Sequence, residues 1–136
     1  MDIRQEVAAL IGHAVTDIAP LGGGCVSAVY ELRLDGGRRL VVKHDEAGAG
    51  GLLVEAFMLR YLAERTPLPV PAVQAVSDRL LVMAYVEGES RFSDASERHA
   101  AELLAALHEL TAPTFGFEHD TLIGGAKWPS GMRADR

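Results

Sequence analysis

Apolar residues recur at helical spacing over residues 3–12, and this stretch ends at Gly12. Three segments that follow read as strands, 16–21, 26–34 and 39–43, and the second of them alternates between apolar and polar positions. Asp35-Gly36-Gly37 separates the last two segments, and Asp-Gly supports the positive φ angles that tight hairpins require. The first 43 residues therefore predict a helix followed by a three-stranded antiparallel meander.

The pattern continues with a second helix and two more strands. Residues 44–51 form a loop rich in Gly and Ala, and residues 52–65 have the spacing of a helix. The proline-rich stretch 66–71 ends that helix because proline lacks the N–H group and fixes φ. Residues 73–76 and 80–86 read as two strands joined by a turn at 77–79. We expect one five-stranded antiparallel sheet with a packed helix.

The polar segment Glu87-Gly88-Glu89-Ser90 divides the chain into a predicted lobe, 1–86, and a second part, 87–136. In the second part we expect a helix over residues 94–110, capped by Asp94 with Glu97 three residues later. Phe115-Gly116-Phe117 and 121–124 suggest a hairpin, and residues 126–136 are polar and without pattern. The apolar stripe of the helix consists of His99, Leu103, Ala106, Leu107 and Leu110.

Composition excludes several classes of protein. With 13 basic and 19 acidic residues the net charge is −6, which argues against a nucleic-acid binder. No apolar run approaches the roughly 20 residues that span a bilayer, and the N-terminus lacks the layout of a signal peptide. Cys25 is the single cysteine, and no Cys/His spacing indicates zinc. We therefore expect a cytoplasmic protein with no membrane partner.

A helical wheel of residues 52–65 places one carboxylate, Glu55, among the apolar residues Leu52, Ala56, Leu59, Leu62 and Ala63. A carboxylate on an apolar face needs a cationic partner, because burying it alone costs several kcal/mol. The chain has only two lysines, Lys43 and Lys127, and Lys43 ends the strand just before this helix. The pattern predicts that Lys43 and Glu55 meet.

The glycine triplet Gly22-Gly23-Gly24 joins two strands ahead of that lysine. A glycine-rich hairpin tip lets backbone N–H groups approach phosphate oxygens, and a lysine held by a helix carboxylate adds a fixed positive charge. This order differs from a Walker loop and from a dinucleotide-binding turn, since the glycines open no helix. Each piece also has a plain structural interpretation: an ordinary turn, a solvated strand end, or a glutamate that reaches water.

Further residues border the same predicted site. Cys25 follows the glycines and is either a reactive thiol or a small filler residue. Met83 and Tyr85 are candidates for the linker wall of an adenine pocket, with the backbone of residues 84–86 facing the base edge. The plain alternative for both is a core strand. The candidate nucleotide-binding residues are Gly22, Gly23, Gly24, Cys25, Lys43, Glu55, Met83 and Tyr85.

The ordered set of motifs resembles the fructosamine/ketosamine kinase family, whose relatives include the aminoglycoside and choline kinases and whose fold is protein-kinase-like. The resemblance covers about residues 3–125, and its most specific part is the motif at residues 115–124. These motifs are Leu21–Ser27, Val41-Val42-Lys43, Glu55 ahead of Leu59-x-x-Leu62, Val70-Pro71, Leu81–Gly88, Leu104–His108 and Phe115-Gly116-Phe117-x-x-Asp120-x-x-Ile123-Gly124.

The resemblance implies an α+β fold: a kinase-like N-terminal lobe joined to the first helix and hairpin of a C-terminal lobe. It also implies ATP as cofactor, with Mg²⁺, and phosphorylation of a sugar-amine or related small metabolite. The family's H-G-D catalytic loop and its metal-binding Asn and Asp have no counterpart here, and Glu109-Leu110 follow His108 instead. We therefore assign no catalytic or metal-binding residue and expect no phosphoryl transfer from this chain alone.

Residues 126–131 do not match the family's Pro-Gln-x-Asn segment, which suggests a truncated or frame-disrupted gene product, or a shortened chain. Two other functions stay open. In the first, the chain acts as a non-catalytic interaction module that self-associates through the apolar face of helix 94–110. Alternatively, it belongs to another small-molecule kinase of the aminoglycoside or choline type, which the hairpin motif disfavours.

Overall fold

The computed structural model describes residues 2–22, 27–124 and 126–131. Two helices and five strands form the first part: α1 (Ile3–Ile11), β1 (Val15–Leu21), β2 (Ala28–Leu34), β3 (Arg39–His44), α2 (Gly51–Arg65), β4 (Val73–Val76) and β5 (Leu80–Ala84). The remainder contains α3 (Asp94–His108), β6 (Thr121–Ile123) and β7 (Ala126–Trp128). The predicted helix ending at Gly12 is confirmed, since Gly12 takes a left-handed φ of 71° and closes α1.

The predicted five-stranded antiparallel sheet is confirmed. Its strand order is β1-β2-β3-β5-β4, and every neighbouring pair is antiparallel. The Asp35-Gly36 turn joins β2 to β3, and Gly36 and Gly37 have φ angles of 85° and 82°. This turn fixes the register in which Arg33 pairs with Arg39 and Val29 with Lys43.

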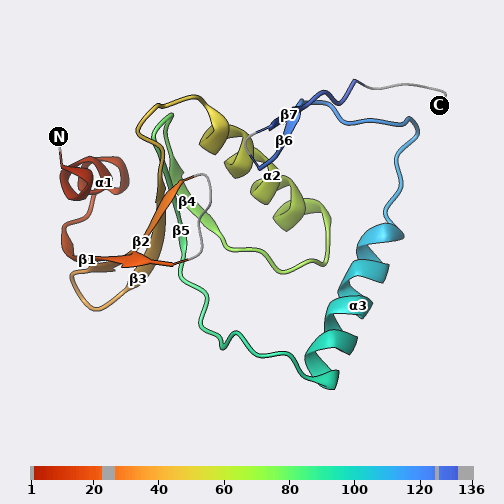
Figure 1. Cartoon of the computed structure of the whole chain (residues 1–136), viewed down its shortest axis with the longest axis horizontal. Helices are drawn as coiled ribbons and strands as arrows, with labels where there is room; N and C mark the ends of the chain where they lie inside the picture. Colours follow the sequence, from red (N-terminus) through yellow and green to blue (C-terminus); the bar gives the residue numbers. More distant parts are fainter. Residues whose placement is uncertain (1, 23–26, 125, 132–136) are drawn as a thin grey trace.

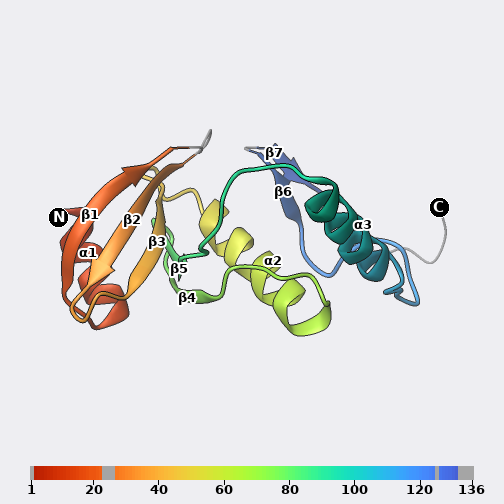
Figure 2. The ribbon, with the colours of Figure 1, turned by 90° about the horizontal axis from the view of Figure 1, so that it is seen from below.

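The sheet lies between α1 and α2 (Figures 1 and 2). Alternate residues of its central strands serve the two faces, so β5 is buried on both sides. Leu80 and Val82 join the core under α1, whereas Leu81 and Met83 join the core under α2. The core under α1 consists of Val7, Val15, Leu32, Leu34, Leu40, Val42, Leu80 and Val82, and the core under α2 of Leu52, Ala56, Leu81 and Met83.

Several predicted boundaries were wrong by a few residues. Strand β2 begins at Ala28, and the expected start at Val26 lies outside the described residues. Strand β5 ends at Ala84 rather than at residue 86, because the chain leaves the sheet there. On α2, Ala63 is exposed although the wheel places it on the apolar arc.

Helix α3 ends at His108, two residues earlier than expected, and its predicted cap was wrong. Ser93 is the N-cap: its hydroxyl accepts from the Ser96 N–H at 3.2 Å, and Ser96 Oγ accepts from the Ser93 N–H at 2.9 Å. Asp94 is therefore the first residue of the helix. No residue of α3 is buried, and Figure 1 shows the helix standing apart from the sheet.

The C-terminal hairpin also differs from the expectation. Thr121–Ile123 pairs with Ala126–Trp128, so the segment predicted to be without pattern contains a strand. The hairpin lies against α2 on the side away from the sheet (Figure 2). Four rings join them: Phe57 and Tyr61 of α2 contact Phe117, with centroids 5.8 and 4.8 Å away, and the His119 ring stands edge-on to Phe57 at 4.5 Å.

Among the described residues, no helix has the length and apolar character that crossing a membrane requires.

Candidate functional site

The predicted contact between Lys43 and Glu55 is present. Lys43 Nζ donates to Glu55 Oε1 at 2.6 Å, joining the end of β3 to the first half of α2. The two side chains are 30% and 34% exposed, so Glu55 is less deeply buried than its place on the wheel suggests. The pair is therefore an ammonium held at a fixed position while still open to solvent on one side.

The sheet face around Lys43 is apolar. Lys43 is paired with Leu81, and Val41, on the same face of β3, is paired with Met83. Met83 is 6% exposed and packs with Leu52 and Ala56 of α2, so this candidate residue is part of the core floor rather than of an open wall. The cation thus stands at the edge of an apolar surface that extends along β3 and β5.

The glycine-rich turn is only partly described. Gly22 follows the last residue of β1, is exposed, and has no neighbouring atom within 4 Å of where a Cβ would be. Gly23, Gly24 and Cys25 lie outside the described residues. Because β1 pairs with β2 up to the Leu21–Val29 pair, and Val29 pairs with Lys43, β1 ends at the Lys43 end of the sheet.

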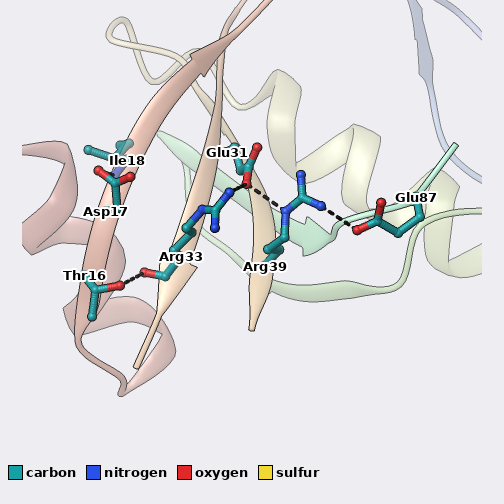
Figure 3. Close-up of polar contacts among 7 residues, drawn as sticks. All are labelled: Thr16, Asp17, Ile18, Glu31, Arg33, Arg39 and Glu87. Carbon is teal, nitrogen blue, oxygen red and sulfur yellow. Dashed lines mark hydrogen bonds and ion pairs between the residues drawn. The ribbon is translucent and has the colours of Figure 1, made fainter. Parts of the chain in front are cut away.

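A second group of charges lies at the other end of the same face (Figure 3). Arg39 Nε donates to Glu31 Oε1 at 2.7 Å, and Arg39 Nη1 donates to Glu87 Oε1 at 2.5 Å. The Arg39 guanidinium lies over the Tyr85 ring, 3.6 Å from its centroid. Arg33 adds a longer ion pair to Glu31 at 3.4 Å. The ring of the candidate residue Tyr85 therefore packs against the Arg39 guanidinium, which comes from β3.

Glu31 and Arg39 shift each other's pKa. The hydrogen bond from Arg39 is the main cause that lowers the pKa of Glu31, against a smaller opposing effect of burial, and the charges of Arg39 and Arg33 add to the lowering. The hydrogen bond to Glu31 likewise raises the pKa of Arg39. Arg39 is thus a permanent cation at this position.

Sequence reasoning missed the roles of Arg39, Glu31 and Glu87. Alternation along β3 puts Arg39 on the same face as Lys43, but the register between β3 and β5 was not predicted. In that register Leu40 pairs with Ala84, which brings Arg39 beside Tyr85. The usable signal was the alternation Arg39, Val41, Lys43 together with the polar residues that follow β5.

Within the described ranges, no group of three His, Cys, Asp or Glu side chains is arranged to hold a metal ion. Those residues therefore offer no cluster for the Mg²⁺ that the resemblance implies. The described residues do provide one fixed, partly open cation beside an apolar sheet face, with the segment that follows β5 at its edge.

The comparisons with known proteins agree with this geometry. Residues 17–134 match the family model described as the phosphotransferase enzyme family, the APH family. The match covers most of the chain, and the chain therefore belongs to that family. A search of curated proteins found no match.

Three solved structures are similar to this chain. A Thermobifida fusca protein provisionally described as a fructosamine-3-kinase is 31% identical, with a TM-score of 0.81 over 98% of this chain and 47% of that one. A Haemophilus somnus 129PT protein of the same description has 21% identity and a TM-score of 0.80, over 97% of this chain and 47% of that one. APH(2″)-IIa, solved with streptomycin and ATP, has 21% identity and a TM-score of 0.58, over 81% of this chain and 40% of that one.

The likenesses at 21% identity show the fold alone. Together with the observed sheet, they establish a kinase-like N-terminal lobe, as the sequence predicts. This chain spans about half the length of the fructosamine-3-kinase structures that it matches.

Proposed function

We propose that this chain binds ATP and forms the nucleotide-binding part of a small-molecule kinase that phosphorylates a sugar-amine or a related metabolite. The observation that carries the proposal is the 2.6 Å contact between Lys43 and Glu55 on the face of a kinase-like sheet. Residues 1–86 are the nucleotide-binding lobe in this proposal, and residues 87–136 are the linker, helix and hairpin that begin a second lobe.

Lys43 is the residue that we assign to the phosphates. A lysine on a free strand end would move among many rotamers, and ordering it on binding would cost entropy. Glu55 removes much of that cost by holding the ammonium in one place, while about a third of the Lys43 side chain stays accessible. Gly22, Gly23 and Gly24 would supply backbone N–H groups to the same phosphates, and Cys25 would lie beside them.

The base would lie along the apolar face. Half-buried Val41 would form its floor, with the buried Met83 beneath it, and Tyr85 and the backbone that follows β5 would form its edge. The Ala84 N–H is already bonded to the Ala72 carbonyl at 2.8 Å, so recognition of the base by linker N–H groups falls to residues after Ala84. A nucleotide bound this way would place its phosphates toward Lys43.

The acceptor is the finer part of the proposal. Its support is the Phe115–Gly124 motif in the sequence and the 31% identity to the protein provisionally described as a fructosamine-3-kinase. The catalytic base and metal ligands would come from a second lobe, since this chain carries no H-G-D motif. We therefore expect ATP binding, and no phosphoryl transfer, from the chain by itself.

Calorimetric titration of ATP with Mg²⁺ tests the binding function. Lys43→Ala should weaken binding about tenfold or more, since a hydrogen bond to a charged group contributes roughly 1.5–3 kcal/mol. Lys127→Ala removes the other lysine, on β7, and should leave the affinity unchanged. Equal affinities for the wild type and Lys43→Ala would contradict the assignment.

A second candidate function is supported by α3. This helix has no buried residue, Leu104 on it is 49% exposed, and Leu110, just past its end, is 50% exposed. Such a face favours association with a second copy of the chain. Light scattering during size-exclusion chromatography should then show a dimer at high concentration that Leu104→Glu converts to a monomer. A monomer in both samples would remove this function.

A further inference from the structure

Arg39 connects β2, β3 and the segment that follows β5. Its side chain leaves the first residue of β3, bonds Glu31 on β2, and bonds Glu87 in the segment after β5. The same guanidinium covers the Tyr85 ring at 3.6 Å. One side chain therefore joins two consecutive strands of the sheet to the linker, the segment 85–93 between β5 and α3.

The linker needs such a tie because the sheet no longer holds it. Strand β5 ends at Ala84, and the next regular element, α3, begins at Asp94. Within that stretch Val86 is 64% exposed and the Glu87 side chain is 79% exposed, so little packing restrains this backbone. Within this segment, Arg39 contacts Tyr85 and Glu87, the residues on either side of Val86.

Arg39 itself is poorly placed to bind phosphate. Its guanidinium already serves two carboxylates and one ring. It also lies four residues before Lys43, which is roughly 13 Å along a strand. Its charge is thus used to hold the linker rather than to attract a ligand.

We propose that Arg39 is a positioning residue that fixes the linker backbone at Tyr85–Glu87 in the conformation that receives the base of the nucleotide. This inference rests on the proposed nucleotide-binding function and deepens it. Arg39 determines the base part of the affinity, whereas Lys43 determines the phosphate part. A ligand that has phosphates but no base should therefore be indifferent to Arg39.

Amide hydrogen exchange of the free protein tests the tie without any ligand. Arg39→Ala should speed exchange of the amides of residues 85–88 about fivefold or more, because the restraining contacts are lost. Glu87→Ala removes one arm from outside the sheet and should act in the same direction, which covers the case that Arg39→Ala disturbs β3. Arg33→Ala is the matched control: it removes a cation that also pairs with Glu31 but does not reach the linker. Unchanged linker exchange in both Arg39→Ala and Glu87→Ala would overturn the proposal.

Calorimetry with ATP and with inorganic tripolyphosphate, each with Mg²⁺, then tests the consequence. Arg39→Ala and Glu87→Ala should weaken ATP binding about fivefold, because a smaller fraction of the protein has a receptive linker, and should leave tripolyphosphate binding within about twofold. Lys43→Ala should weaken both ligands. Equal losses for ATP and tripolyphosphate in Arg39→Ala and Glu87→Ala would overturn the positioning role and leave the proposed function standing. Absence of ATP binding by the wild type would instead overturn the proposed function and this inference with it.

Discussion

Removal of the Phe117 ring should release the β6–β7 hairpin from α2. Phe117 stands edge-on to Tyr61, with ring centroids 4.8 Å apart, and tilted to Phe57 at 5.8 Å. Each aromatic pair contributes about 0.5–1.5 kcal/mol beyond its buried area. Phe117 is only half-buried, so the loss stays below the roughly 3–5 kcal/mol of a fully buried phenylalanine. We expect Phe117→Ala to cost about 2 kcal/mol of docking free energy.

Hydrogen exchange of the β6 amides, Thr121–Ile123, measures that docking directly. A cost of about 2 kcal/mol corresponds to an opening equilibrium about 30-fold more favourable, and exchange should accelerate by that factor. Phe92→Ala is the control, since Phe92 is 90% exposed in the linker. Exchange that is unchanged in Phe117→Ala, or that rises equally in Phe92→Ala, would refute the ring cluster as the contact that holds the hairpin.

Three further predictions concern the fold and its charges. Leu81 is fully buried under α2, so Leu81→Ala should lower the free energy of unfolding in urea by about 3 kcal/mol, whereas Leu53→Ala, at a half-exposed position, should change it by less than about 1 kcal/mol. Ser93→Ala removes the α3 cap and should cost about 1 kcal/mol of helix stability, seen as lost helical ellipticity, while Asp94→Ala should cost less because Asp94 lies inside the helix. The arginine that binds Glu31 lowers the pKa of Glu31 from its ordinary value of 4.5, so its stabilising contribution is complete above that pH and is lost as the pH falls through the lower folded-state pKa. Urea midpoints measured from pH 7 to pH 3 should therefore fall less steeply in Glu31→Gln, and identical slopes would contradict the ion pair.

The sheet and the Lys43–Glu55 contact could be predicted because both follow from local patterns. Strand alternation and the Asp35-Gly36 turn set the β2–β3 register, and register decides which residues share a face. Glu55 needed a cation, and Lys43 ends the strand just before the helix that carries Glu55. The pairing was thus constrained before any tertiary information entered.

The Arg39 cluster could not be predicted in the same way. Its contacts join β3 to residues about 46 positions later, and they depend on the pairing of Leu40 with Ala84. Strand alternation alone puts Arg39 on the correct face, but nothing in the local sequence brings Tyr85 or Glu87 to it. A long-range register is fixed by the packing of the whole sheet rather than by any one turn.

The C-terminal hairpin shows a different reason for failure. Phe57 and Tyr61 lie about 140–180° around α2 from Leu52, so the helix has a second apolar face opposite the first. A helical wheel that is analysed for a single apolar arc places the rings of Phe57 and Tyr61 on the solvent side. Strand β7 has only three residues, all exposed, which is too short for strand alternation to appear.

The most direct test of the account is a double-mutant cycle on ATP affinity with Lys43→Ala and Glu55→Gln. If Glu55 acts by holding the Lys43 ammonium, Glu55→Gln should weaken ATP binding several-fold in the wild type and have no further effect once Lys43 is alanine. The two losses should therefore be non-additive. Additive losses, or ATP binding unchanged by Lys43→Ala, would contradict the claim that this ion pair forms the phosphate side of a nucleotide site.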